Sequence, residues 1–285
     1  MDFTKPTDTY KLSNGVEIPC IGFGTWQIAD GKEASDAVLH ALEAGYRHID
    51  TAYAYGNERG VGDGIKRSGL PREDLFITSK LENPTRGYQE TLDIFQDSLD
   101  MLGTDYLDLY LVHWPNPIHF RDSWKEKNAE SWRAMEKLYK EGKIRAIGVS
   151  NFFEHHLEAL DETAEVKPMV NQIHISPGET QSELVSYCRS RGMLIEAYSP
   201  LGTGKVLESP DLITLAHKYR VSVPQLCLRW SLQNGYLPLP KSKDKDRSKQ
   251  NLDVFGFVIS DEDILTISSL RGVSGEQTDP DTAPF

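Results

Sequence analysis

Side chains that can move protons or bind polar ligands recur along the chain, each at or near the end of a short apolar segment. One such residue, taken singly, more often caps a helix or completes a structural hydrogen bond. A succession of them is harder to explain in this way, because burying many polar groups at one place is costly unless they are paired or used. The set comprises Asp50, Lys80, His113-Trp114, Ser150-Asn151, Asn171-Gln172, Tyr198-Ser199 and Lys241-Ser242. The pattern therefore predicts one shared chemical site.

The apolar segments that carry these residues have the length of β-strands, and segments with helical spacing separate them. Phe95, Leu99 and Leu102 recur at three- and four-residue steps, which is typical of a helix between two strands. Gly103 and Gly192 stand where such helices should stop. We expect strands at residues 21–24, 47–50, 75–79, 106–113, 144–150, 169–173, 193–198 and 236–240.

Eight strand–helix units with no linker between them predict a (β/α)8 TIM barrel, with residues 1–285 forming a single domain. Asn14-Gly15, between two short strand-like segments, predicts an N-terminal β-hairpin before the barrel. In such a barrel the carboxyl ends of all strands meet at one mouth, which would bring the polar residues together. Pro238 inside the last expected strand argues against the barrel, because proline cannot donate a hydrogen bond to a ladder.

Two other patterns favour a nucleotide-binding fold of a different kind. Gly22-Phe23-Gly24 follows a strand and Asp50 ends the next one, as in an open dinucleotide-binding sheet, but Gln27 stands where the third glycine belongs. Tyr139 and Lys143 have the spacing of the pair in short-chain dehydrogenases, although no glycine-rich loop precedes them. We therefore retain the barrel as the prediction.

Composition excludes several classes of protein. A net charge of -12 argues against binding to nucleic acid or to an anionic membrane surface. Three cysteines do not suggest a disulfide framework, and no stretch resembles a signal peptide or a membrane span. We expect a soluble, cytoplasmic protein. Its oligomeric state cannot be read from the sequence, and a monomer is compatible with it.

Several motifs, which follow one another along the chain in the order given below, resemble those of the aldo-keto reductase family. Asp50-Thr51-Ala52-Tyr53-Ala54-Tyr55-Gly56-Asn57-Glu58 is similar to the family's DTAxxYxNE signature. Four further segments resemble its lysine strand, histidine strand, amide-binding turn and phosphate-binding segment. They are residues 77–80, 110–115, 148–152 and 240–242, the last with Arg247 and Asn251. The resemblance runs from about Tyr10 to the end of the chain.

This resemblance implies a catalytic tetrad of Asp50, Tyr55, Lys80 and His113. Reduction of an aldehyde or ketone places a hydride on carbon, while the oxygen must receive a proton, which Tyr55 would donate. An ammonium within ~4–6 Å of a phenol, here Lys80, should lower the phenol's pKa from its usual value near ~10. Asp50 would keep Lys80 charged, and His113 would hydrogen-bond the substrate oxygen.

The resemblance also implies NADPH as the cofactor, with NADH as a weaker alternative. Ser150, Asn151 and Gln172 would bind the nicotinamide carboxamide, and Tyr198 would stack on the ring. The basic stretch from Lys241 to Lys249 stands out in an acidic chain and suits the 2′-phosphate. The expected cofactor contacts are Gly24, Thr25, Trp26, Asp50, Ser150, Asn151, Gln172, Tyr198, Ser199, Leu201, Lys241, Ser242, Arg247, Gln250 and Asn251. No metal is expected.

We expect the substrate to be a small carbonyl compound that contacts Trp26, Tyr55, His113 and Trp114. Tyr53 and Phe120 are further candidates for the pocket wall. The short polar tail resembles those of microbial members such as diketo-gluconate reductase-like enzymes, which implies an open pocket accepting aldehydes, dicarbonyls or keto sugars. Three features depart from the family's usual residues, and none touches the tetrad. The sixth strand leads into Ile173-His174-Ile175-Ser176-Pro177, where the family usually has a Glu and then an aromatic residue or Leu before His-Pro, and the other two are Ser248 and Gln250.

Two other functions use the same fold. A non-catalytic NADPH-binding regulatory subunit would keep the basic stretch, but it would not need the complete tetrad. A Schiff-base aldolase would use a lysine at a strand end, here Lys80. NADPH consumption with a generic aldehyde separates the first alternative from a reductase, and borohydride trapping on Lys80 would reveal the second.

Overall fold

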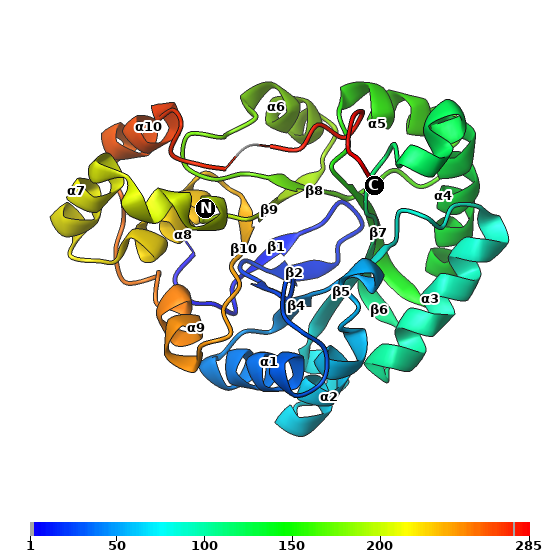
Figure 1. The fold of residues 1–285 in the computed structure, drawn as a ribbon, viewed down its shortest axis with the longest axis horizontal. Coiled ribbons are helices and arrows are strands. Elements are labelled where there is room, and N and C mark those ends of the chain that lie inside the picture. Colours follow the sequence, from blue (N-terminus) through cyan, green and yellow to red (C-terminus); the bar gives the residue numbers. More distant parts are fainter. Residues whose placement is uncertain (1–2, 276) are drawn as a thin grey trace.

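The computed structural model describes residues 3–275 and 277–285, and within them eight parallel strands surround a common axis (Figure 1). The strands follow one another around the sheet in chain order from β3 to β10. They are β3 (Phe23–Gly24), β4 (His48–Asp50), β5 (Phe76–Leu81), β6 (Leu107–Val112), β7 (Ile144–Ser150), β8 (Val170–His174), β9 (Leu194–Tyr198) and β10 (Leu237–Leu239). This is the predicted (β/α)8 architecture, with most strands shorter than the sequence suggested.

Backbone hydrogen bonds between the last strand and the first close the barrel. The Gly22 amide donates to the Pro238 carbonyl at 3.1 Å, and the Gly24 amide donates to the Pro240 carbonyl at 3.0 Å. Pro238 is tolerated because its carbonyl accepts one of these hydrogen bonds, and because β3 has only two residues and therefore needs few hydrogen-bond partners. The closure shows that the open dinucleotide-binding sheet is wrong.

Helices form the outer layer of the molecule and pack their apolar faces on the strands (Figure 1). In α3, for example, the predicted stripe of Phe95, Leu99 and Leu102 is buried, and Gly103 ends the helix with a left-handed φ of 66°. The helices are α1 (Lys32–Ala44), α2 (Glu58–Ser68), α3 (Tyr88–Leu102), α4 (Trp124–Lys140), α5 (Glu154–Asp161), α6 (Ser182–Ser190), α7 (Pro210–Tyr219), α8 (Val223–Gln233), α9 (Lys245–Leu252) and α10 (Asp261–Ser269).

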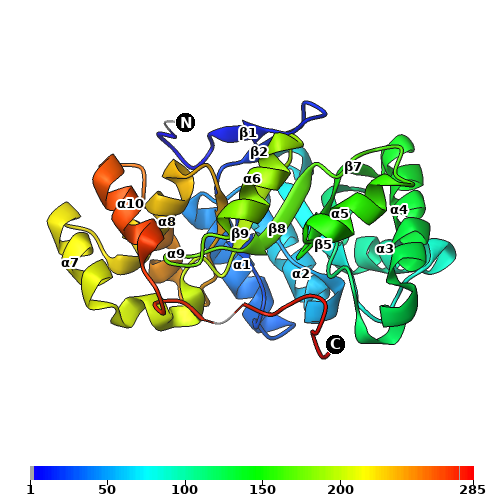
Figure 2. The same ribbon diagram turned by 90° about the horizontal axis from the view of Figure 1, so that it is seen from above.

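The N-terminal hairpin covers the amino end of the barrel. Its strands β1 (Thr9–Lys11) and β2 (Glu17–Pro19) pair antiparallel. The Tyr10 hydroxyl donates to the carbonyl of Tyr236, just before β10, at 3.0 Å, and the Asn14 side chain donates to the Arg145 carbonyl on β7 at 2.9 Å. Figure 2 shows the hairpin and the C-terminal tail on opposite sides of the molecule. The other end of the barrel is therefore the one available for a site.

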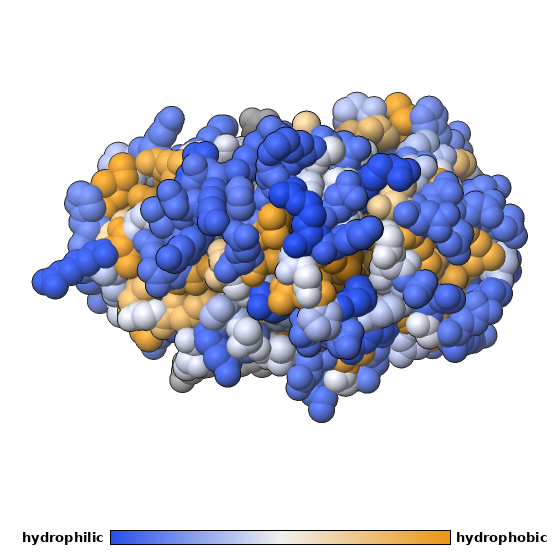
Figure 3. Space-filling model, turned by 90° about the horizontal axis from the view of Figure 1, so that it is seen from below, coloured by the Kyte–Doolittle hydropathy of each residue, from blue (hydrophilic) through white to orange (hydrophobic). Residues whose placement is uncertain are grey.

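The outer surface is mainly polar. The face shown in Figure 3 carries mostly hydrophilic side chains, with the hydrophobic ones in separate groups. None of the helices in the described residues combines the length and apolar character that crossing a membrane requires. Lys80, Glu196 and His48, by contrast, point polar groups into the barrel interior and are fully buried.

Candidate functional site

A cavity of about 1240 Å³ opens at the carboxyl end of the barrel. Its walls come from segments that follow β3, β4, β5, β6, β9 and β10, from the ends of β7, β8 and β9, and from the C-terminal tail. Side chains from the sequence-predicted set that line it are Trp26, Asp50, Tyr55, His113, Trp114, Ser150, Asn151, Gln172, Tyr198, Ser199, Leu201 and Lys241, and Gly24 lines it too. The strand-end residues are thus brought to one place.

The four residues of the predicted tetrad lie together on the cavity wall or directly behind it. Lys80 Nζ lies 2.8 Å from each carboxylate oxygen of Asp50 and donates to the Thr51 carbonyl at 2.8 Å. The same ammonium lies 3.4 Å from the Tyr55 hydroxyl. The ring of His113 packs edge-on against that of Tyr55, with 5.6 Å between centroids. The buried ammonium thus contacts both the carboxylate and the phenol.

Tyr55 reaches this position through a tight turn that the neighbouring residues hold. It ends the 3₁₀ segment η1 (Tyr53–Tyr55), and Gly56 follows with a left-handed φ of 63°. Asn57 is fully buried: its amide donates to two carbonyls of the loop after β3, and its oxygen accepts from Thr51. The conformation of the turn is therefore fixed by buried hydrogen bonds.

Charge and burial set the protonation of the tetrad. Burial alone would lower the pKa of Lys80, but the charges of Asp50 and Tyr55 outweigh it, so the pKa is raised and the ammonium stays charged. Burial raises the pKa of Tyr55 more than Lys80 lowers it. The expected net lowering is thus wrong for this structure, because the phenol is desolvated. Burial, then Lys80, holds the pKa of His113 well below its usual value, which keeps the imidazole neutral.

The amide-binding residues form a hydrogen-bonded group beside the tetrad. Ser150 donates to the Gln172 carbonyl, and Asn151 donates to the His113 carbonyl at 3.0 Å and to the Ser150 hydroxyl at 3.1 Å. The Tyr198 hydroxyl donates to the Asn151 side-chain oxygen at 2.8 Å. Hydroxyl and amide groups in this number suit a ligand that carries a carboxamide.

The basic stretch lies at the far end of the same cavity. Lys241 lines the cavity, and within residues 3–275 and 277–285 it forms no ion pair. Partial burial, then the nearby Lys243, lowers the pKa of Lys241. Lys243 and Lys245 pair with Glu33 and Glu43 of α1, at 2.7 Å each. An incompletely neutralised cation at this end fits an anionic group of a ligand.

Several predicted contacts lie outside the cavity wall. Thr25 is fully buried and bonds the Asp50 carbonyl, while Ser242 hydrogen-bonds the backbone of Asp244. Arg247, Gln250 and Asn251 lie on α9, close along the chain to Lys241 but not among the lining residues. The proposed pocket residues Tyr53 and Phe120 are likewise absent from the wall, because their short 3₁₀ segments direct other residues, such as Tyr55 and His119, toward it.

The sequence reasoning missed several parts of the wall, among them Asn83 and Pro84 after β5 and the two segments described next. One is the 3₁₀ segment η4 (Gly202–Glu208), which contributes Thr203, Lys205 and Leu207. The other is the C-terminal tail, whose Phe285 packs edge-on against Trp114 with centroids 4.8 Å apart. His174, from the strand segment that departs from the family's pattern, also lines the cavity beside Tyr198.

Asp281 anchors the tail. Its carboxylate accepts from Asn116 at 3.0 Å and from His156 at 2.9 Å, and it lies 3.1 Å from His155. These two histidines and Asp281 are close enough to hold a metal ion. However, His156 Nδ1 accepts from the Phe153 amide, so the neutral ring carries its proton on Nε2 and donates it to Asp281. The geometry describes a hydrogen-bonded anchor.

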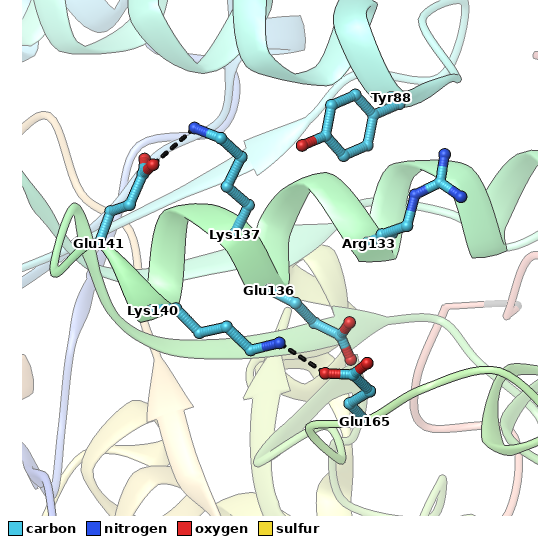
Figure 4. A pocket seen from close by; sticks show the side chains of 7 residues that line it. All are labelled: Tyr88, Arg133, Glu136, Lys137, Lys140, Glu141 and Glu165. Carbon is cyan, nitrogen blue, oxygen red and sulfur yellow. Dashed lines mark hydrogen bonds and ion pairs between the residues drawn. The ribbon is translucent and has the colours of Figure 1, made fainter.

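A second hollow lies on the outer surface, along α4 and facing α3 (Figure 4). Its charged side chains are already paired: Lys137 with Glu141, and Lys140 with Glu165. Arg133 lies over the ring of Tyr88, 5.0 Å from its centroid. Exposed pairs of this kind are worth little and leave no charge directed at a ligand, so we place the site in the barrel mouth.

Known proteins resemble this chain in sequence and in fold. The model of the aldo/keto reductase family matches residues 20–271. The glyoxal reductase of Bacillus subtilis is 49% identical over 282 residues, which cover 99% of both chains. The structure of a Bombyx mori aldo-keto reductase in complex with NADP is 35% identical with a TM-score of 0.83, covering 92% of both chains. A mutant of Gox0644 in complex with NADPH is 36% identical with a TM-score of 0.90, covering 98% of this chain and 99% of the other. The chain belongs to the aldo/keto reductase family and is an oxidoreductase.

Proposed function

We propose that the protein reduces the carbonyl group of small aldehydes, ketones or dicarbonyls such as glyoxal, using NADPH, with Tyr55 as the proton donor. The observation that carries this proposal is the 3.4 Å contact between the ammonium of Lys80 and the hydroxyl of Tyr55 at the cavity wall. Relatives solved with NADP and NADPH support the choice of cofactor.

The cavity fits a nicotinamide dinucleotide at both ends. One end offers the buried hydrogen-bonding groups of Ser150, Asn151 and Gln172, and the other offers Lys241. When bound, the cofactor supplies a hydride to the carbonyl carbon. Tyr198 would support the ring, and Lys241, with Arg247 nearby, would bind the 2′-phosphate that distinguishes NADPH from NADH.

Tyr55 would give its proton to the substrate oxygen as that oxygen becomes negative. Its raised pKa keeps the phenol protonated before the reaction, as a proton donor must be. Lys80 would then stabilise the tyrosinate at short range, and Asp50 holds Lys80 in place through two 2.8 Å contacts. The neutral imidazole of His113 can donate a hydrogen bond to the same oxygen and orient it.

The same geometry argues against a Schiff-base aldolase. Such a lysine must be neutral to attack a carbonyl, whereas the ion pair with Asp50 keeps Lys80 charged. An NADPH-binding regulatory subunit would not require the assembled tetrad.

A panel of carbonyl compounds that includes glyoxal tests the proposal, with NADPH and NADH compared for each compound. We expect loss of NADPH absorbance with several aldehydes and slower turnover with NADH. Tight binding of NADPH without turnover of any compound would support the regulatory subunit instead.

A further inference from the structure

A buried carboxyl group that the proposed reaction does not use lies beneath the tetrad. Glu196 occupies the middle of β9 and is fully buried in the barrel. Sequence offers one signal of it, a single acid within the apolar segment Met193–Tyr198. A buried carboxyl group is costly unless it is partnered, which raises the question of what it holds.

Gln172 links Glu196 to the tetrad. The Nε2 atom of Gln172 donates to Glu196 Oε2 at 2.8 Å and to Asp50 Oδ2 at 2.9 Å. A primary amide has two N–H donors, and here both go to carboxyl oxygens. The reverse orientation would direct the amide oxygen at two acids. Gln172 must therefore present its oxygen to the cavity that it lines.

An amide oxygen at this point accepts a hydrogen bond and donates none. The ligand group that matches it is an N–H donor, and the carboxamide of a nicotinamide ring carries one. The neighbouring Ser150 and Asn151 contribute both donors and acceptors. The direction of the Gln172 amide is thus fixed by the two carboxyl groups behind it.

The protonation of Glu196 keeps the tetrad's charges balanced. Burial, and then the charge of Asp50, raises the pKa of Glu196 to about 8. Lys80 opposes this shift, and His48, whose Nε2 lies 3.8 Å from Glu196 Oε1, is neutral because burial lowers its pKa to about 3. Near neutral pH, Asp50 and Lys80 therefore form the charged pair, and Glu196 adds no second negative charge.

We propose that Glu196 is a positioning residue of the hydride-transfer site, which holds the amide of Gln172 with its oxygen toward the carboxamide of the nicotinamide ring. The inference rests on the proposed function, because it requires a nicotinamide cofactor in the cavity. It adds a role for a residue that touches neither the cofactor nor the substrate.

The test compares two ligands that differ only at the carboxamide. NADP+ has the N–H donor, whereas its acetylpyridine analogue carries a methyl ketone there and has none. Dissociation constants of both are measured by quenching of tryptophan fluorescence, to which Trp26 and Trp114 in the wall contribute. The proteins are the unaltered chain, Glu196→Leu, Glu196→Gln, and Glu58→Gln as the matched control. Glu58 is also a buried glutamate, but it bonds Ser79 and Ser98 instead of Gln172.

Glu196→Leu should raise the dissociation constant of NADP+ by about two- to tenfold, which is the worth of one net hydrogen bond. The dissociation constant of the analogue should not change. Glu196→Gln should bind both ligands like the unaltered protein, because its amide oxygen can still accept from Gln172. Glu58→Gln should change neither. Equal weakening of both ligands by Glu196→Leu, or no weakening, would overturn the inference alone. Failure of the unaltered protein to bind NADP+ would overturn the proposed function as well.

Stability gives a readout that needs no cofactor. With a pKa raised from 4.5 to about 8, Glu196 holds its proton in the folded state, while the unfolded chain releases it. Stability should therefore fall as the pH rises through this window, and Glu196→Gln should lack that loss. The unfolding constant of the unaltered protein, relative to Glu196→Gln, should rise by up to about tenfold per pH unit in urea titrations. A ratio independent of pH would show that Glu196 is already ionised and would overturn its neutral role.

Discussion

The two ends of the barrel are built from the same strands but differ in backbone conformation and in the use of their polar groups. At the amino end, local backbone hydrogen bonds close the hairpin turn, and a glycine, Gly15, takes its left-handed position with a φ of 90°. At the carboxyl end, four non-glycine residues that line the cavity have a positive φ: Gln27, Asn151, Ser199 and Thr203. Each such residue costs on the order of 1–3 kcal/mol.

Polar groups differ between the ends in the same sense. Asp108, near the amino end, accepts from two arginines and a backbone amide. At the carboxyl end, His113 and His174 line the cavity, and the Nδ1 atom of each is buried without a hydrogen-bond partner among the described residues. Tyr46 and His48, toward the amino end, also carry buried polar atoms without a partner, but neither residue lines the cavity. The carboxyl end therefore differs in its strained backbone and in hydrogen-bonding capacity on residues of the cavity wall. The comparison predicts that substitutions at the two ends will separate stability from activity.

The largest expected effect is on kcat, without a matching effect on cofactor binding or stability. Tyr55→Phe removes the proposed proton donor and should lower kcat by about 10²–10⁴-fold, the usual worth of general acid catalysis. Binding of NADPH, measured by fluorescence, and the unfolding midpoint should hardly change. Tyr53→Phe is the matched control, because Tyr53 starts the same 3₁₀ segment but does not line the cavity. Comparable activity of Tyr55→Phe would show that another group delivers the proton.

The opposite effect, a loss of stability without a loss of activity, is expected for a substitution in the hairpin region. Ile18 is fully buried against the amino end, and Ile18→Ala should reduce the free energy of unfolding by about 2–5 kcal/mol through the cavity it leaves. At a temperature where the variant is still folded, its kcat and KM should match the unaltered protein. Val258→Ala, at an exposed site, serves as the control for both measurements. A loss of kcat in folded Ile18→Ala would mean that the two ends are coupled.

A smaller effect is expected at the far end of the cavity. Lys241→Ala removes one charged hydrogen-bonding group and should raise the KM for NADPH by about tenfold, with little change for NADH. High salt should reduce the difference, since the lysine is partly exposed. Lys66→Ala on the exposed surface of α2 controls for net charge. Equal effects on both cofactors would contradict the assignment to the 2′-phosphate.

The smallest effect concerns the tail. Asp281→Asn keeps the shape of the anchor but removes the charge that faces His155 and His156, so Phe285 should be held less firmly against Trp114. We expect a rise of about two- to tenfold in the KM for carbonyl substrates, with the KM for NADPH unchanged. Asp279→Asn, two residues earlier in the same tail, provides the comparison. An unchanged carbonyl KM would remove the tail from the substrate pocket.

The sequence was sufficient to predict the barrel and the proximity of the strand-end residues Asp50, Lys80 and His113. The reason is topological: in a parallel barrel every strand delivers its last residues to one end, so Asp50, Lys80 and His113 must approach one another. The covalent order of the chain thus specifies their proximity without any knowledge of packing.

Other parts of the site could not be obtained in this way. The contact between Asn116 and Asp281 joins residues that are 165 positions apart in the chain, and no strand order dictates it. The sign of the pKa shift at Tyr55 depends on how fully the phenol is desolvated, and the sequence does not contain that quantity. Glu196 was visible as an acid in an apolar strand, but its partner Gln172 required coordinates.

The closure of the amino end of the barrel by the hairpin has a kinetic consequence. Because it covers the amino end, molecules must reach the described cavity from the carboxyl side, and Gln172 lies deep there with only 2% of its surface exposed. A nicotinamide ring seated on it would lie below any carbonyl compound held by Tyr55 and His113. We therefore expect a compulsory sequence of events in each turnover, in which the cofactor arrives first and the spent cofactor departs last.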